Sequence, residues 1–243
     1  RNAALASALL PTDMAFLHYR SAAFMIHRSK QVPGISVIWD LLLSFTASSE
    51  DPISGGRHKV LGSKRLFIPP QTSTIASHLP KAMGAALSIP RAKHLAIESL
   101  MPKDSIVICN FGDASFNHST SLGALNCTEW ISYQSVPLPI LYVCEDNGLG
   151  ISVPTPDNWI KSQMANRPVF KYFECNGLNL IETLDISKKA VDYVRRTKKP
   201  AFLHIYTVRL LGHAGSDIES IYRTNKEIEN TEALDPLINP LKY

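Results

Sequence analysis

Closely spaced cysteines are missing from this chain. Its 243 residues include four cysteines, and no two of them form a Cys-X-X-Cys motif or a metal-ligand spacing. Cys109 and Cys144 fall within apolar runs. We therefore expect buried thiols in a reducing compartment, and neither a disulfide framework nor a cysteine-based metal centre.

Long apolar runs and a dinucleotide fingerprint are missing as well. No segment approaches about 18 uninterrupted apolar residues, so we expect no membrane span. We also expect no signal peptide. No Gly-X-Gly-X-X-Gly follows an apolar run, which makes a dinucleotide-binding domain a weak alternative.

A strong excess of one charge is also absent. The net charge is +4, and basic residues are scattered apart from small clusters such as Arg195-Arg196 and Lys198-Lys199. Short clusters of this kind usually mark a solvated helix end. Without a basic stripe interleaved with aromatic side chains, the sequence predicts no nucleic-acid partner.

The composition fits one large soluble domain. Hydrophobic residues make up 45% and charged residues 19% of the chain, as is usual for a globular protein. We expect a single domain over residues 1–243, in which 219–243 form a C-terminal helix and tail. The chain opens at Arg1 in mid-pattern rather than at Met, so we also expect truncation at the N-terminus.

Apolar runs alternating with helical patterns predict an α/β fold. Strands are expected at 105–111, 139–144 and 201–208, and 48–65 is expected to be a long functional loop. Expected helices cover 5–28 with a break at Pro11, 37–45, 81–89, 119–133, 188–196 and 219–230. Such alternation gives a mostly parallel sheet between two layers of helices, a three-layer α/β/α arrangement.

Polar side chains follow two of the expected strands. Asp113 can supply a carboxylate oxygen, Asn147 an amide oxygen, and Leu149 a backbone carbonyl. These are ligands that Mg2+ prefers, usually together with phosphate oxygens. Alternatively, Asp113 caps the following helix and Asn147 sits in a turn with Gly148. Because ligands bind parallel sheets at the carboxyl ends of strands, the paired occurrence favours a magnesium–diphosphate site.

The same residues carry a resemblance to a known family. Gly112-Asp113-Ala114 followed by Asp146-Asn147 resembles the thiamine diphosphate motif, a Gly-Asp-Gly with an Asn-Asn further along the chain. The surrounding sequence resembles the alpha subunit, or the alpha-like half of a fused bacterial form, of the first component of 2-oxoacid dehydrogenase complexes, of the pyruvate and branched-chain type. The similar segments, in chain order, are 19–20, 56–57, 72–84, 112–119, 143–154 and 209–223.

The resemblance implies a thiamine diphosphate-binding fold with thiamine diphosphate and Mg2+ as cofactors. The implied metal ligands are Asp113, Asn147 and Leu149, and the implied catalytic residue is His213. The implied cofactor-binding residues are Tyr19, Arg20, Thr74, Ile75, Gly112, Asp113, Ala114, Ser115, Asn147, Leu149, Ile151 and His213.

Individual roles follow from the resemblance and from side-chain chemistry. The guanidinium of Arg20 would bind the diphosphate, and Ile75 would be an apolar wedge between the two cofactor rings. His213 would reach the cofactor and the reacting centre. By residue type alone, Arg20 could be a surface helix charge, Ile75 a core residue, and His213 a loop histidine bonded to Asp217.

Several positions depart from the family pattern. Ala114 replaces the second glycine, where its backbone amide and that of Ser115 would meet the diphosphate at a helix start. Asp146 replaces the first asparagine. His78 stands where the family often has a glutamine near a monovalent-cation site, which leaves potassium (K+) binding open. Ala214 replaces a serine phosphorylated in mitochondrial relatives, so we expect a bacterial-type cytoplasmic enzyme rather than one of the mitochondrial matrix.

The implied function is oxidative decarboxylation of a 2-oxoacid, with acyl transfer to the lipoyl group of an acyltransferase partner. In the resembled family, the glutamate that activates the cofactor comes from another subunit or half, and no segment here resembles that domain. We therefore expect this chain to supply the diphosphate and metal half of an interface site, which a beta-type subunit or domain completes. The alternatives are another thiamine diphosphate reaction, of the transketolase or decarboxylase type, and a non-catalytic partner-binding subunit with weakened cofactor affinity.

Overall fold

A five-stranded parallel sheet forms the centre of the computed structural model, which describes residues 1–237. Its strands, in spatial order, are β1 (Met14–Phe16), β2 (Val107–Gly112), β3 (Ile140–Asp146), β7 (Ala201–Tyr206) and β6 (Lys171–Asn176). Every neighbouring pair is parallel. The three central strands are buried almost throughout, as their mainly apolar sequences favour in a sheet covered on both faces.

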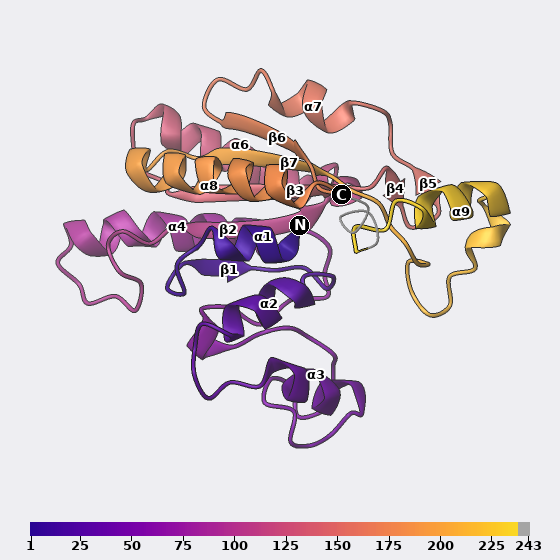
Figure 1. Cartoon of the computed structure of the whole chain (residues 1–243). Helices are drawn as coiled ribbons and strands as arrows, with labels where there is room; N and C mark the ends of the chain where they lie inside the picture. The colour runs from indigo at the N-terminus through magenta and orange to yellow at the C-terminus, as the bar shows by residue number, and fades with distance from the viewer. Residues whose placement is uncertain (238–243) are drawn as a thin grey trace.

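Helices cover both faces of the sheet and give the chain three layers (Figure 1). Successive strand residues contribute to opposite cores, so that Leu203 packs in one core and Phe202 in the other. The first core also contains side chains of α1 (Asn2–Ser7), α2 (Ala22–Ser29) and α8 (Leu180–Thr197). The second contains side chains of α4 (His78–His94), α6 (Ser119–Tyr133) and α7 (Trp159–Met164). The expected three-layer α/β/α fold is confirmed.

Short elements surround the carboxyl end of the sheet. Helix α5 (Asp113–Phe116) follows β2, and the two-stranded antiparallel ribbon of β4 (Leu149–Gly150) and β5 (Val153–Pro154) follows β3. Figure 1 shows this ribbon at the same end of the molecule as α9 (Asn225–Glu232). The remaining elements are α3 (Val37–Phe45) and the 3-10 turns η1 (Lys64–Leu66) and η2 (Glu219–Ile221).

Most of the expected elements are present. The three predicted strands form the centre of the sheet, and the helices predicted at 37–45 and 119–133 have the predicted limits. The helix predicted at 188–196 is the second half of α8, which begins earlier because Asn179 caps it by accepting from the Glu182 amide at 3.1 Å. The predicted loop at 48–65 contains no helix before η1.

Two strands of the central sheet and the short ribbon of β4 and β5 were missed, and further helices have limits other than those predicted. The segment expected to be helical over 5–28 contains β1, whose three residues are too few to show a strand period. Strand β6 was missed because it lies at the sheet edge and carries polar residues. Helix α4 extends beyond the predicted 81–89, with Pro80 tolerated in its first turn and Pro90 inside it. The helix predicted at 219–230 is divided into η2 and α9, because Thr224 and Glu227 form a capping box that starts α9.

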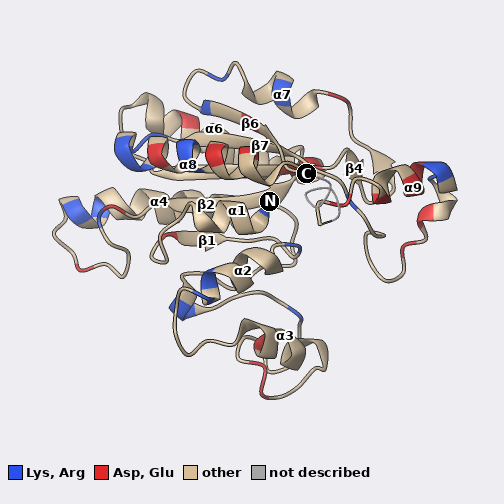
Figure 2. Ribbon diagram, in the orientation of Figure 1, with Lys and Arg blue, Asp and Glu red and all other residues tan. Residues whose placement is uncertain are grey.

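Charges of both signs are distributed over several elements (Figure 2). Along α8, for example, Lys189 pairs with Asp185 and Arg196 pairs with Asp192 on the exposed face. The cysteines Cys109 and Cys144 are buried and unpaired, as expected. Among residues 1–237, none of the helices combines the length and the apolar character that crossing a bilayer requires.

A buried carboxylate joins the start of the sheet to α8. Asp13 is fully buried and accepts two hydrogen bonds from Arg195, at 2.6 Å and 3.1 Å. It also accepts from the backbone amides of Leu10 at 2.8 Å and Ile106 at 3.0 Å. A bidentate ion pair of this kind is costly to break on one side, since the remaining charge stays buried.

We expect Arg195→Met to lower the free energy of unfolding by about 2–3 kcal/mol, because Asp13 then keeps only its two backbone donors. Urea denaturation monitored by circular dichroism measures the change. The matched control is Arg196→Met, which removes an exposed pair with Asp192 and should change stability little. Equal effects of the two substitutions would contradict the role assigned to Asp13.

Candidate functional site

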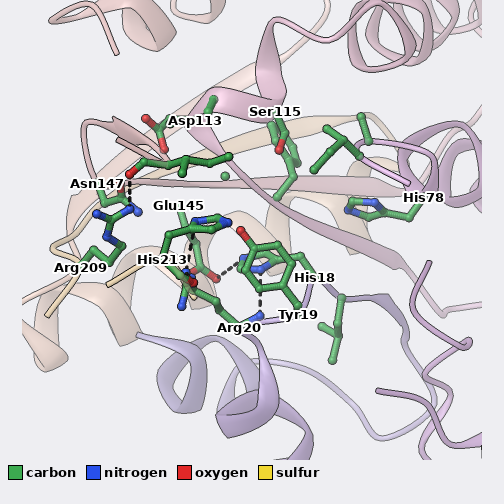
Figure 3. Close-up of a pocket in the computed structure, with 18 of the residues that line it drawn as sticks. His18, Tyr19, Arg20, His78, Asp113, Ser115, Glu145, Asn147, Arg209 and His213 are labelled. Atoms are coloured by element: carbon green, nitrogen blue, oxygen red, sulfur yellow. Dashed lines mark hydrogen bonds and ion pairs between the residues drawn. The ribbon is translucent and has the colours of Figure 1, made fainter. Parts of the chain in front are cut away.

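The carboxyl ends of the central strands border a cavity of about 360 Å³ (Figure 3). This volume is within the range of small-molecule sites, about 300–1,000 Å³. Parallel pairing places Gly112 beside Glu145 and Asp146 beside Tyr206, so the segments that follow β2, β3 and β7 emerge at one edge. A cavity at this edge is where ligands bind in open parallel sheets.

Every residue that the sequence predicted for the site lines this cavity. They come from segments that are far apart in the sequence, from Tyr19 to His213. They are Tyr19, Arg20, Thr74, Ile75, Gly112, Asp113, Ala114, Ser115, Asn147, Leu149, Ile151 and His213. The structure thus brings the predicted residues together, while the individual roles stay predictions.

Asp113 is a buried carboxylate without a basic partner. It is the first residue of α5, and Gly112 rather than Asp113 occupies the N-cap position. The hydroxyl of Thr155 donates to Asp113 Oδ2 at 2.6 Å. Among the described residues no ion pair includes Asp113. Burial raises the pKa of Asp113, against the lowering effect of the Thr155 bond, and a cation bound beside it would favour the charged form.

Asn147 lies in a tight turn that also lines the cavity. Its Oδ1 accepts from the backbone amide of Leu149 at 3.0 Å, and Gly148 has φ +73°. The alternative of a simple turn with Gly148 is therefore correct for the backbone, but it does not remove Asn147 from the cavity wall. Figure 3 shows Asn147 and Asp113 near each other on one side of the site.

Ala114 is accommodated by a glycine on the neighbouring ribbon. A Cβ atom placed on Gly150 would lie 3.0 Å from Ala114 Cβ. The methyl group that replaces the family's second glycine therefore occupies space that Gly150 leaves open. The two small residues together keep the wall of the cavity next to α5 close-packed.

The backbone after Gly150 is held in an unfavourable conformation. Ile151 has φ +59°, which is rare for a β-branched residue and costs on the order of 1–3 kcal/mol. Arg209, which is buried, donates to the Ile151 carbonyl at 2.6 Å. Arg209 also donates to the Tyr222 hydroxyl at 2.6 Å and to Glu219 at 3.3 Å. The segment that follows β7 thus fixes the segment that follows β3.

Tyr19, Arg20 and His213 form a second group in the cavity (Figure 3). Arg20 donates through Nη2 to the His213 carbonyl at 2.5 Å and lies 5.1 Å from the centre of the Tyr19 ring. The Tyr19 and His213 rings meet edge to face at 6.0 Å. Arg20 precedes α2 rather than belonging to a surface helix, so that alternative is wrong.

The His213 ring is not bonded to Asp217. It is the backbone amide of His213 that donates to Asp217, at 2.6 Å, and the Tyr222 hydroxyl donates to the same carboxylate oxygen. Burial and the positive charge of Arg20 lower the pKa of the His213 imidazole. A neutral ring that faces the cavity can accept or relay a proton near neutral pH.

Sequence reasoning missed a polar group at the base of the cavity. Glu145 is buried and bonds Arg1 Nε at 2.5 Å, while its other oxygen is 3.7 Å from His18 Nε2. Burial alone would raise the pKa of Glu145, but Arg1 and His18 hold it well below its usual range. His18 in turn accepts from the Arg20 amide at 3.1 Å. The available signal was position, because Glu145 directly precedes Asp146-Asn147 and His18 precedes Tyr19-Arg20.

Two other histidines near the predicted motifs differ in position. His78 lines the cavity and bonds the carbonyl of Asn110 through Nε2 at 2.8 Å, and burial lowers its pKa. His118 is not part of the cavity lining and caps α6 by accepting from the Thr120 amide at 3.2 Å. Of these two histidines, His78 is therefore the one placed to contact a ligand in the cavity.

A metal site here would depend on amide and carbonyl oxygens. Within the described part of the chain, no group of three or more His, Cys, Asp or Glu could hold a metal ion. Asp113, Asn147 and Leu149 line one cavity and offer one carboxylate, one amide and one backbone carbonyl. Such a set suits Mg2+, which commonly takes one or two carboxylates and completes its shell with phosphate and water.

The sequence of the chain matches the model of a known protein family over almost its whole length. The model of the family described as "Dehydrogenase E1 component" matches residues 2–243. The chain belongs to the dehydrogenase E1 component family. The resemblance to an alpha subunit of that component is confirmed by its curated relatives.

Relatives of this E1 component chain include alpha subunits of 2-oxoisovalerate dehydrogenase. That of Bacillus subtilis is 28% identical over 84% of this chain and 59% of its own length. The mitochondrial subunit of Mus musculus is 26% identical over 98% of this chain and 50% of its own length. A solved structure described as a thiamin diphosphate-dependent enzyme isolated from Mycobacterium smegmatis is 17% identical, with a TM-score of 0.49 over 86% of this chain and 31% of that chain, a likeness too loose to support an assignment. The chain spans about half the length of the curated relatives it matches.

In this E1 component chain we expect Arg20→Met to raise the pKa of His213, because removing a nearby cation makes protonation of the ring less costly. A pH titration of the histidine ring signals by NMR measures the change. Arg20→Lys is the matched control, since it keeps the charge and should keep the pKa lowered. An unchanged pKa in Arg20→Met would show that the Arg20 charge does not act on His213.

Proposed function

We propose that this chain supplies the diphosphate and metal half of a thiamine diphosphate- and Mg2+-dependent active site. The observation that carries the proposal is the placement of Asp113, Asn147 and Leu149 on the same cavity as Arg20 and His213. Membership of the E1 component family supports it. The proposed reaction is oxidative decarboxylation of a 2-oxoacid, with the acyl group passed to lipoyl on an acyltransferase partner.

The chemistry of the cavity fits the cofactor. When bound, thiamine diphosphate supplies a carbon nucleophile and an electron sink for decarboxylation. Asp113, Asn147 and the Leu149 carbonyl would hold Mg2+, and that cation would compensate the unpaired charge of Asp113. The backbone amides of Ala114 and Ser115 and the guanidinium of Arg20 would bind the diphosphate.

Apolar and ring-bearing residues would orient the rest of the cofactor. Ile75 is 50% exposed on the cavity wall, so it is not a core residue and is free to pack against a ligand. Thr74, Gly112 and Ile151 border the same space. Tyr19 is 45% exposed and keeps the His213 ring in place by edge-to-face contact. His213 would then bind or move a proton next to the reacting centre.

Magnesium-dependent binding tests the assignment of Asp113. We expect Asp113→Asn to weaken binding of thiamine diphosphate in the presence of Mg2+ by on the order of 100-fold or more. Substitution of a residue that only orients a metal ligand costs about 10–100-fold in affinity, and substitution of the ligand itself should cost more. The affinity is measured by calorimetric titration of thiamine diphosphate into the complex of the chain and its beta-type partner. The control is Asp157→Asn, which changes an exposed carboxylate on the loop after β5 and should leave affinity unchanged. Undiminished binding by Asp113→Asn would contradict the assignment, and absence of binding by the unmodified chain would favour a non-catalytic subunit.

The proposed need for a partner has its own test. The chain lacks a segment resembling the domain that provides the activating glutamate, so we expect no turnover of pyruvate or branched 2-oxoacids by the isolated chain. Adding a beta-type subunit should restore lipoyl-dependent product formation. Clear turnover without the partner would contradict the proposal that this is half of a site. The cytoplasmic location stays a prediction.

A further inference from the structure

Asp146, the residue that departs from the family's asparagine, bonds a histidine of the neighbouring strand. Its neighbours Glu145 and Asn147 line the cavity, whereas Asp146 does not. Its Oδ2 bonds His204 Nε2 at 2.8 Å, and its Oδ1 accepts from the Gly148 amide at 3.0 Å. Both oxygens of the carboxylate are therefore used inside the protein.

His204 bonds Asp146 from a fully buried position in β7. Its second ring nitrogen, Nδ1, bonds the Tyr172 hydroxyl of β6 at 2.8 Å. An ionised carboxylate can only accept, so Nε2 must donate to Asp146. The contacts form a chain across three adjacent strands, from Tyr172 through His204 to Asp146.

The chain of contacts ends at the turn that carries two of the proposed metal ligands. The backbone carbonyl of Asp146 accepts from the Thr207 amide at 2.7 Å, and that of Gly148 accepts from the Thr155 amide at 2.9 Å. The Asp146 side chain adds the bond to the Gly148 amide inside the turn. Asn147 and Leu149, on either side of Gly148, are thus placed by the bonds that Asp146 and Gly148 make.

Resting on the proposed function, we propose that His204 is a positioning residue that acts through Asp146 to hold the metal-binding turn. In metal sites, partners that orient the ligands affect affinity although they do not touch the metal. The Asp146 departure is then the half-buried member of a pair with the buried His204 and leaves the ligand positions intact. Tight cofactor binding should accordingly depend on a residue in the middle of β7.

The test compares two substitutions of His204 by calorimetric titration with thiamine diphosphate in the presence of Mg2+, using the chain together with its beta-type partner. His204→Leu removes the donor to Asp146, and we expect affinity to fall by about 10-fold or more. His204→Gln retains an amide donor that can reach Asp146, and we expect it to recover most of the affinity. Thermal midpoints measured in parallel report stability separately from binding.

Val194→Ala is the matched control, because it removes buried methyl groups from α8 without touching the turn. It should lower the thermal midpoint and leave affinity unchanged. The inference is overturned if His204→Leu binds like the unmodified protein, if His204→Gln loses as much affinity as His204→Leu, or if Val194→Ala loses affinity equally. Failure of the unmodified complex to bind the cofactor would instead overturn the proposed function, and the inference with it.

Discussion

Parallel pairing of β2, β3 and β7 is the constraint on which the rest of the site depends. The register sets Gly112 beside Glu145 and Asp146 beside Tyr206, so three chain segments leave the sheet at one level. A shift of one residue in either pair would turn each strand's side chains to the opposite core, which the two apolar layers prevent. The hydrophobic effect in the cores thus fixes the positions of polar groups at the sheet edge.

The cavity has an acidic side and a basic side that are built differently. Asp113 and the Asn147 turn are fixed by the sheet and its first helix, while Arg209 and the segment carrying His213 are fixed by bonds among themselves and to Ile151. The proposed magnesium–diphosphate ligand would match both sides, because a cation would face a carboxylate and phosphates would face guanidinium and amide donors. The unpaired, buried carboxylate is the feature that most favours a cation.

Strand ends and their side chains could be predicted from the sequence because they follow local apolar runs. Asp113 and Asn147 were found in this way, and the ordered family segments added Arg20, Ile75 and His213. Edge strand β6 was not found, because its polar residues hide the apolar pattern. Glu145 was missed for a different reason, since its importance depends on Arg1 and His18, which approach it only in three dimensions. A local pattern identifies where a strand ends, but not which distant side chains meet there.

The bond between Asp146 and His204 also means that substitutions at one position affect the other, although the two are 58 residues apart. Replacing His204 alone leaves a half-buried carboxylate without its donor, and replacing Asp146 alone leaves a buried ring nitrogen without an acceptor. Sequence drift at either position is therefore restricted by the other, and viable variants should change both together. A comparison that scores each motif position separately would count Asp146 as a harmful substitution. The bond to His204 instead makes the two residues a pair that should be scored together.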